Sequence, residues 1–256
     1  IGLLLLSCSL FMSCMQADKK KALIEDDFLV AEQHLSNQLK AVPEPTVYPR
    51  TTGKDGQLIA TPKNDWTEGF YPGCLWYIYE HNREESWKQS AVKWTEALEP
   101  MKKLTSHHDI GFLIYCSFGN GYRLTGKEEY KDVIIEAANS LTTRFSEVTG
   151  CIKSWNYRKA WNGKDEWFYP VIIDNMMNLE LLYFASKVTG DTRYAKIATT
   201  HAETTAKNQL REDYSNYHVV DYDTLTGKVL HQATCQGFSD NSAWARGQAW
   251  AIYGYT

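Results

Sequence analysis

Three stretches of the chain repeat one helical pattern, and this repeat restricts the fold more than any other feature. In residues 80–88, 124–131 and 188–196 an apolar helix ends, a Gly or Asn suited to a left-handed cap follows, and an aromatic residue opens the next helix. This is the pattern of an αα-hairpin used several times. The aromatic residues Trp87, Tyr130 and Tyr194 are 43 and 64 positions apart. Such uneven spacing favours a ring of hairpins over an α-solenoid of the tetratricopeptide kind.

The remaining sequence predicts further helices and one small hairpin of strands. Apolar residues at helical spacing predict a helix over 19–41, which Pro43 and Pro45 end. A polar loop is expected over 43–65, and long connections over 148–170 and 212–240. Alternation around Gly227 predicts a β-hairpin within 216–231. The other helices are expected at 68–81, 84–100, 109–124, 127–147, 172–188, 191–211 and 241–256. We therefore expect an all-α toroid whose loops build a cleft at one end.

The first 18 residues are typical of an export leader and a short tether. An apolar run ends at Cys14 in a segment that resembles a bacterial lipobox, and Cys8 is a weaker second candidate. The run is too short to span a membrane. We expect an exported protein, either periplasmic or attached to a bacterial membrane only through a lipid at the N-terminus. An ordinary cleaved signal is the alternative. Residues 19–256 are then one catalytic domain, and the apolar helix at 243–256, which has no stop signal, predicts that this domain is truncated at its C-terminus.

Composition excludes some classes of function. The net charge is −4 and Lys19–Lys21 is the longest basic run, which argues against nucleic-acid binding. Aromatic residues make up 13% of the chain, a share that suits either the binding of sugar rings or a large helical core. The cysteines beyond the leader are scattered without metal-ligand spacing, so zinc is not expected. They are Cys74, Cys116, Cys151 and Cys235.

Two aspartates are the strongest candidates for chemistry. Asp109 opens a predicted helix, where the helix N-terminus lowers the pKa of a carboxyl group; a plain N-cap aspartate is the alternative. Asp174 lies in the apolar run 171–179, where loss of solvation raises the pKa. Two carboxyl groups with opposite environments allow one to act as an acid while the other stays charged.

Several polar and aromatic residues near these aspartates suit an anionic sugar. Arg246, between Trp244 and Trp250, could bind a carboxylate or hydrogen-bond an aspartate. His108 and His218 are donors at neutral pH, with a structural role equally open for each. Gln236 lies in a loop where it could bind hydroxyl groups. The candidates for stacking on sugar rings are Trp66, Trp155, Trp161, Trp244 and Trp250.

Four segments of the chain resemble a known family. They are 65–73, 107–112, 173–179 and 244–250, and in this order they are similar to the unsaturated glucuronyl hydrolases of glycoside hydrolase family 88. The likeness runs from about residue 20 to the end. Family 105, the unsaturated rhamnogalacturonyl hydrolases, is the near neighbour. The resemblance implies an (α/α)6 barrel of six hairpins, of which roughly two-thirds is present here.

The resemblance also implies roles for individual residues. Asp174 corresponds to the general acid and base, and Asp109 to an essential second aspartate. Positions that line the pocket in this family correspond here to Trp66, His108, His218, Gln236, Arg246 and Trp250. Trp155 and Trp161 have no counterpart among the family's pocket residues. The implied substrate is a Δ4,5-unsaturated uronic acid at the non-reducing end of an oligosaccharide made by a polysaccharide lyase, as in glycosaminoglycan degradation. Neither a metal nor an organic cofactor is implied.

Two other kinds of protein compete with a hydrolase. A non-catalytic, lipid-anchored glycan-binding protein would keep the aromatic residues but would not need two buried aspartates. A polysaccharide lyase on a similar toroid would need a Tyr and His pair, which His218 or His231 near Tyr217 or Tyr222 could supply.

Overall fold

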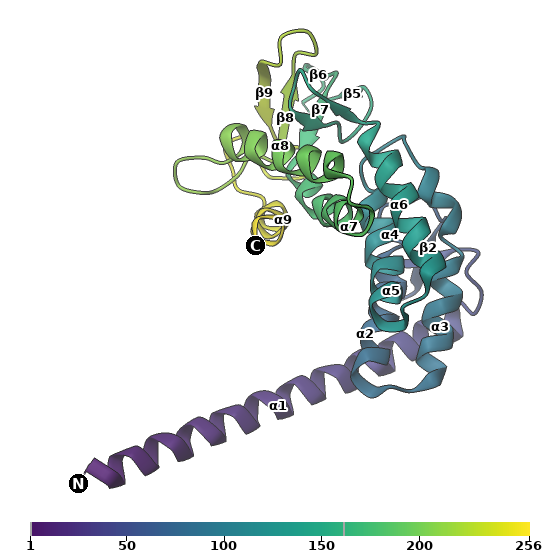
Figure 1. Cartoon of the computed structure of the whole chain (residues 1–256), viewed down its shortest axis with the longest axis vertical. Helices are drawn as coiled ribbons and strands as arrows, with labels where there is room; N and C mark the ends of the chain where they lie inside the picture. Colours follow the sequence, from purple (N-terminus) through teal and green to yellow (C-terminus); the bar gives the residue numbers. More distant parts are fainter. Residues whose placement is uncertain (1, 161) are drawn as a thin grey trace.

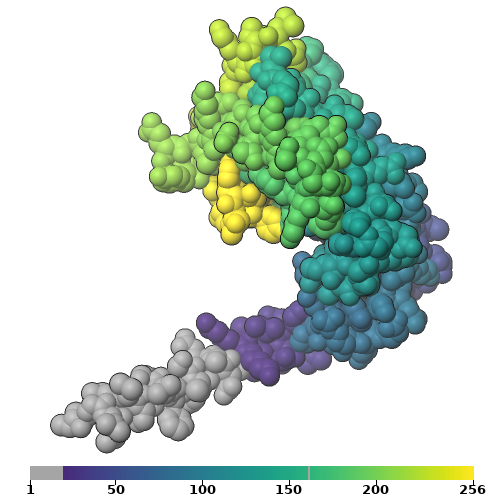
Figure 2. All heavy atoms as spheres, in the orientation of Figure 1, coloured from purple at the N-terminus to yellow at the C-terminus, as the bar shows by residue number. Residues whose placement is uncertain are grey.

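The computed structural model describes residues 2–160 and 162–256, with side chains from residue 20 onward. Trp161 therefore lies outside the described residues. The chain is mostly helical, as expected, and its hairpins follow an open curve from α1 to α9 (Figure 1). The last helix lies in the hollow of this curve, where it is yellow in Figure 2.

The helices and turns agree closely with the predicted ranges. The α-helices are α1 Gly2–Ala41, α2 Phe70–Asn82, α3 Glu85–Glu96, α4 Ile110–Ile114, α5 Asn120–Thr125, α6 Glu128–Thr142, α7 Leu179–Thr189, α8 Thr192–Gln209 and α9 Ala245–Tyr255. Shorter turns are the 3-10 turns η1 Glu99–Lys103 and η3 Ile173–Asn178 and the π-helical turn η2 Tyr115–Gly119. The predicted helix over 109–124 is thus α4, η2 and α5, joined by a π-turn in which Ser117 Oγ donates to the Leu113 carbonyl.

The hairpin caps confirm two of the three predicted left-handed positions. Gly126 and Gly190 end α5 and α7 with φ of 67° and 75°. In the first copy the left-handed residue is Arg83, with φ of 60°, and not Asn82. The side chain of Asn82 instead accepts a hydrogen bond from the Glu84 amide, so it holds the turn while the next residue takes the left-handed conformation.

Helix α1 is longer than the predicted helix over 19–41, because it continues without a break back to Gly2. Its second half packs on α2: the Phe28 ring stacks on His81 at 3.9 Å, and His81 Nε2 lies 3.1 Å from Glu25. Among the described helices, none combines the length and apolar character needed to cross a membrane.

Short strands lie in the connections between the helices. They are β1 Tyr48–Thr52, β2 Leu58–Thr61, β3 Phe145–Ser146, β4 Cys151–Ile152, β5 Arg158–Lys159, β6 Glu166–Trp167, β7 Pro170–Ile172, β8 Val219–Tyr222 and β9 Val229–Ala233. The predicted hairpin within 216–231 is confirmed as β8 and β9. The polar loop predicted over 43–65 was wrong in part, because β1 and β2 pair there, and buried Tyr48 anchors them by donating to the Trp94 carbonyl.

The core lies between the helices of successive hairpins. Leu75, Trp76, Ile114 and Leu182 are completely buried in one cluster that extends from α2 to α7. Each hairpin returns the chain to the end of the fold from which it started, so α2, α4, η3 and α9 all begin at one common end. Glycines allow these four segments to contact one another closely there.

Candidate active site

The beginnings of four helical segments meet at one end of the fold. A Cβ on Gly69, just before α2, would lie 2.0 Å from the Phe112 carbonyl of α4. A Cβ on Gly111 of α4 would lie 2.2 Å from Asn178 Oδ1 of η3, and one on Gly247 of α9 would lie 3.0 Å from Ile173 of η3. The absence of side chains at these glycines lets the segments approach closely. The residues at these helix starts are therefore neighbours, although the sequence separates them widely.

Asp109 lies in this region as an ionised carboxylate. It precedes α4, but its side chain makes no capping hydrogen bond, so the plain N-cap alternative is wrong. Instead Asp109 Oδ2 lies 2.9 Å from His107 Nδ1 and Oδ1 lies 3.3 Å from His108 Nε2. Burial favours the protonated form, yet the neighbouring His108, His107 and Arg144 outweigh it and hold the pKa of Asp109 below its usual value. The direction agrees with the prediction, but the cause is these neighbours.

His108 supports Asp109 from the interior. Its ring is completely buried, and the amide of Asn178 lies 3.2 Å from Nδ1. An amide nitrogen can only donate, so Nδ1 accepts and the ring proton is on Nε2, facing Asp109 Oδ1. Burial lowers the pKa of His108, which keeps the ring neutral. The predicted contact of His108 with substrate stays a prediction; in this structure the ring contacts Asp109.

A β-sheet brings Asp174 and His218 together. Strands β7 and β8 pair with Ile172 opposite Val219, and the Ile173 amide donates to the His218 carbonyl at 3.0 Å. Asp174 follows β7 and His218 precedes β8, so the two side chains leave the same end of the sheet. His218 Nε2 lies 3.6 Å from Asp174 Oδ2, and both atoms are buried without a hydrogen-bond partner among the described residues.

Backbone contacts fix the tautomer of His218. The amides of Cys235 and Gln236 donate to Nδ1 at 3.0 and 3.2 Å, so the ring proton must be on Nε2 and point to Asp174. Burial, followed by the charges of Arg246 and Arg158, lowers the pKa of His218 to about 3. His218 is therefore a neutral donor aimed at Asp174.

Asp174 is the buried acid of the site. Its side chain is largely shielded from solvent, with the residue only 5% exposed. Loss of solvation and then the charge of Asp109 raise its pKa to about 7, against smaller opposing effects of its own backbone amide and of Arg246. The charge of Asp109 thus acts on Asp174, and both carboxyl groups are buried. Below about pH 7 Asp174 therefore keeps its proton in most molecules, while the lowered pKa of Asp109 keeps that carboxyl group ionised.

Aromatic rings and one arginine surround the two aspartates. The guanidinium of Arg246 lies 4.5 Å from the Trp244 ring centre and 5.5 Å from that of Trp66, and it donates to Gln236 Oε1. Arg246 and Gln236 are exposed, so both can contact a ligand. On the Asp109 side, Phe112 links Trp66 and Trp250 through ring contacts of 5.7 and 5.4 Å. All eight predicted site residues thus lie in or directly behind one cluster.

Comparison with known proteins identifies the family of the chain. The sequence profile described as Glycosyl Hydrolase Family 88 matches residues 42–256. The chain belongs to glycoside hydrolase family 88. An unsaturated glucuronyl hydrolase of Formosa agariphila is 49% identical over 211 residues, which cover 82% of this chain and 52% of that protein. An unsaturated chondroitin disaccharide hydrolase of Streptococcus agalactiae is 40% identical over 198 residues, covering 74% of this chain and 47% of that protein.

Solved structures of family 88 confirm the fold. The crystal structure of an unsaturated glucuronyl hydrolase specific for heparin superposes with a TM-score of 0.84 and 43% identity, and it covers 90% of this chain and 60% of that one. Such proteins have an (α/α)6 barrel, as the family resemblance implied, and this barrel is a ring of hairpins of the kind that the repeat predicted. The chain spans about half the length of the curated relatives it matches.

Several residues of this family 88 site were not identified from sequence. Asn178 lies within a recognised motif, and only its contact with His108 reveals its role. Arg144 has no local signal; it is buried, donates to the Thr105 and Lys153 carbonyls, and helps to keep Asp109 ionised. Trp155 is a stacking candidate by sequence without a counterpart in the family pattern, and its ring lies edge-on to His218 at 6.2 Å.

A separate cavity lies beside the aspartate cluster. It has a volume of about 630 Å³ and lies along α4, α5, α7 and α9 on the inner side of the curve. Phe112, Met177, Glu180 and Tyr253 are among its lining residues. None of the predicted site residues lines it, so we assign the chemistry to the cluster and not to this cavity. Among the described side chains, no group of His, Cys, Asp and Glu is placed to hold a metal ion.

Proposed function

We propose that the protein is a hydrolase that removes a Δ4,5-unsaturated uronic acid from the non-reducing end of oligosaccharides produced by a polysaccharide lyase. The observation that carries this proposal is the pair of shielded aspartates, with the pKa of Asp174 raised to about 7 and that of Asp109 lowered. The names of its family 88 relatives, unsaturated glucuronyl hydrolase and unsaturated chondroitin disaccharide hydrolase, support the same substrate class.

The reaction begins with proton transfer to the vinyl ether of the uronate. Asp174, which keeps its proton up to about pH 7, gives it to C4, and the positive charge that forms is shared by C5 and the ring oxygen. His218 Nε2–H faces Asp174 Oδ2 and can donate to the carboxylate that remains. Ionised Asp109 stabilises the positive charge in a site shielded from water.

Water then completes the reaction. The carboxylate of Asp174 takes a proton from a water molecule whose oxygen bonds to C5, giving a hemiketal. The hemiketal opens by breaking the bond between C5 and the ring oxygen, and C1 is left as a hemiacetal. Its collapse releases the neighbouring sugar, and the uronate leaves as an open-chain keto acid. No covalent bond to the protein forms, so the carboxylate-separation rule for ordinary glycosidases does not apply.

The other site residues have positioning and binding roles in this proposal. Arg246 lies on two tryptophan rings with its charge exposed, which suits the uronate carboxylate. Gln236 is placed to bind hydroxyl groups, and Trp66 and Trp250 contact the sugar ring. His108 acts through Asp109. The chemistry requires neither a metal nor a cofactor.

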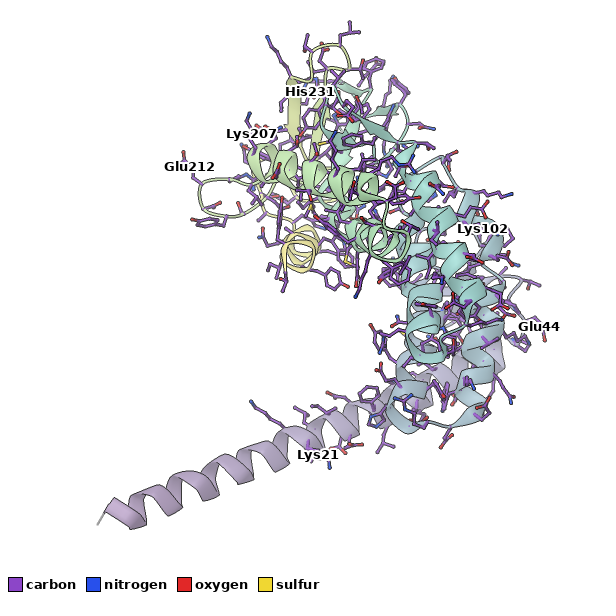
Figure 3. The ribbon with its side chains drawn as sticks, viewed as in Figure 1. Lys21, Glu44, Lys102, Lys207, Glu212 and His231 are labelled. Carbon is purple, nitrogen blue, oxygen red and sulfur yellow. The ribbon has the colours of Figure 1, made fainter. Side chains whose placement is uncertain are left out.

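Three rival functions remain to be separated by experiment. A family 105-like unsaturated rhamnogalacturonyl hydrolase would use the same residues on a different leaving sugar. A glycan-binding protein would not need a buried acid. A lyase base is less well supported, since Tyr222 OH is buried against Asn208, and His231 lies on the outer strand β9, where Figure 3 labels it.

The ultraviolet absorbance of unsaturated disaccharides distinguishes these functions. The conjugated double bond absorbs light, so a hydrolase removes the absorbance, a lyase creates it from polymer, and a binding protein leaves it unchanged. The assay uses the complete protein that carries these residues, with disaccharides from chondroitin, hyaluronan, heparin and pectin. The pectin-derived substrate tests the family 105-like activity.

Replacing the acid tests the mechanism directly. We expect Asp174→Asn to lower turnover by a factor on the order of 10²–10⁴, with the melting temperature retained, because one proton-transfer group is lost. In the wild type, kcat/KM should decline above about pH 7 as Asp174 ionises. If Asp174→Asn keeps more than about a tenth of the wild-type rate, far above the residual rate expected without a general acid, Asp174 is not the acid.

We also propose that the protein is exported, with residues 1–18 as leader and tether and a lipid on Cys14, the new N-terminus after cleavage, as its only link to a membrane. The lipobox-like sequence supports this proposal. Expression of the natural protein in a bacterium, followed by fractionation and mass spectrometry of the N-terminus, tests it. An unmodified N-terminus in the cytoplasmic fraction would contradict export.

A further inference from the structure

Two arginines lie next to His218, and only one has a role in the proposed reaction. Arg246 lies over Trp244, whose ring centre is 4.3 Å from that of His218. Arg158 lies 4.5 Å from the ring centre of Trp155, which in turn contacts His218 edge-on. The charges of both arginines lower the pKa of His218, so both act on the same site.

The position of Arg158 is set by the backbone of a short hairpin. Strand β5 pairs with β6, and Arg158 is opposite Trp167, whose buried side chain anchors the hairpin. The guanidinium of Arg158 is exposed and has no hydrogen bond or ion pair with any described residue. Stacking on the Trp155 ring orients the guanidinium of Arg158 and leaves its N–H groups free for a ligand.

The site has more positive charge than the single carboxylate of a uronate requires. The uronate has one carboxylate, for which Arg246 is the cation. Below about pH 7 Asp174 keeps its proton in most molecules, and burial keeps His218 neutral. Asp109 already has His107, His108 and Arg144 beside it. Arg158 therefore remains as a second cation without an anion.

We propose that Arg158, held on Trp155, forms a subsite for an anionic group, a sulfate ester or a carboxylate, on the sugar next to the unsaturated uronate. This inference rests on the proposed hydrolase function and deepens it by naming the class of leaving sugar. A guanidinium binds such groups through paired hydrogen bonds, and the indole face beneath it contacts the sugar ring.

The test compares sulfated and unsulfated substrates in the complete protein. Unsaturated chondroitin disaccharides with and without one sulfate on the hexosamine differ only in the proposed anion. We expect Arg158→Ala to raise KM for the sulfated disaccharide roughly tenfold or more, with kcat less affected, and to change KM for the unsulfated one less than about twofold. Arg158→Lys should recover part of the loss, because it keeps the charge but not the paired hydrogen bonds.

Lys159→Ala is the matched control, since it removes the same charge from the next, also exposed, residue of β5. It should leave the ratio of the two KM values unchanged. Equal effects of Arg158→Ala on both substrates, or no effect on either, would overturn the subsite while the hydrolase function stands. If the wild type consumes no unsaturated disaccharide of any source, the proposed function itself fails, and this inference with it.

Discussion

Among single residues, Asp109 and Asp174 differ because their neighbours differ. Asp109 lies beside two histidines and near the guanidinium of Arg144, whereas Asp174 is shielded from solvent and its Oδ2 faces the neutral ring of His218. Ionised Asp109 also raises the pKa of Asp174, so each aspartate helps to set the state of the other. The two histidines are sequence neighbours of Asp109, whereas Arg144 and His218 come from distant segments that the local sequence does not reveal.

Arg246 provides a prediction about binding. We expect Arg246→Ala to raise KM for an unsaturated disaccharide roughly 10- to 100-fold, because a charge-assisted contact with the uronate is lost. Arg246 lowers the pKa of Asp174, so its removal should also shift the alkaline decline of kcat/KM to higher pH. Kinetics across pH and thermal unfolding check this. A large fall in melting temperature with unchanged KM would identify a structural arginine instead.

Glu68 provides a prediction about stability. It is 1% exposed, neither of its carboxyl oxygens has a partner among the described residues, and burial raises its pKa from 4.5 to about 8. In the unfolded chain Glu68 ionises above about pH 4.5. Folding must therefore retain the proton between about pH 4.5 and 8, and the free energy of unfolding falls across this window.

Glu68→Gln should remove this penalty. At pH 8 we expect it to stabilise the fold by about 2 kcal/mol, which raises the melting temperature by roughly 4–8 °C, with little change near pH 4.5. Glu212→Gln, in the exposed loop labelled in Figure 3, is the control and should have no such pH-dependent effect. An equal gain at both pH values would show that ionisation of Glu68 is not the cause.

Among the secondary-structure elements, the close contact between α4 and η3 positions the site. Gly111 of α4 lies against Asn178, and η3 carries Asp174. The tight 3-10 geometry of η3 is supported by the Asn175 side chain, which donates to the Ile152 carbonyl at 2.8 Å. The position of Asp174 therefore depends on how closely the two elements approach.

Gly111→Ala should separate these two elements. The added Cβ would meet Asn178 backbone and side-chain atoms within 3 Å. We expect a loss of about 1–3 kcal/mol of stability and a fall in kcat/KM of roughly 100-fold, because Asp174 is displaced. Gly119→Ala is the control, since its Cβ would meet only the Tyr115 ring, at 3.0 Å or more. Equal activity of the two variants would mean that this contact does not position Asp174.

At the scale of the whole molecule, the hairpins follow an open curve with apolar residues on its inner side. Tyr77 and Tyr253 line the 630 Å³ cavity there and are about half exposed, and the neighbouring Ile252 is 63% exposed. Exposed apolar groups of this kind favour association.

We therefore expect the 256-residue chain, expressed by itself, to bind a hydrophobic dye and to self-associate. Ile252→Lys should weaken both effects. Leu225→Lys, at the exposed turn between β8 and β9, should weaken neither. Dye fluorescence and sedimentation measure the two effects. A chain that stays monomeric without binding the dye would contradict this expectation.

The sequence by itself determined the helical hairpins, most of their ends and the two aspartates at helix starts. These features depend on local patterns: apolar spacing, the left-handed glycines Gly126 and Gly190, and turn residues. The left-handed Arg83 was not predicted, because the Asn82 side chain holds the turn by accepting from the Glu84 amide and the left-handed conformation moves to the next residue. The strands β1 and β2 were not predicted, because buried Tyr48 anchors them through a contact with the distant Trp94.

Only the tertiary structure decided which side chains meet. The register of β7 and β8 places His218 beside Asp174, and packing at Gly111 places Asn178 behind His108. The same packing gives Trp155 and Arg158 their places near His218. Protonation states follow from these contacts, because a pKa is set by solvent exclusion and nearby charge, and both come from residues far apart in the chain.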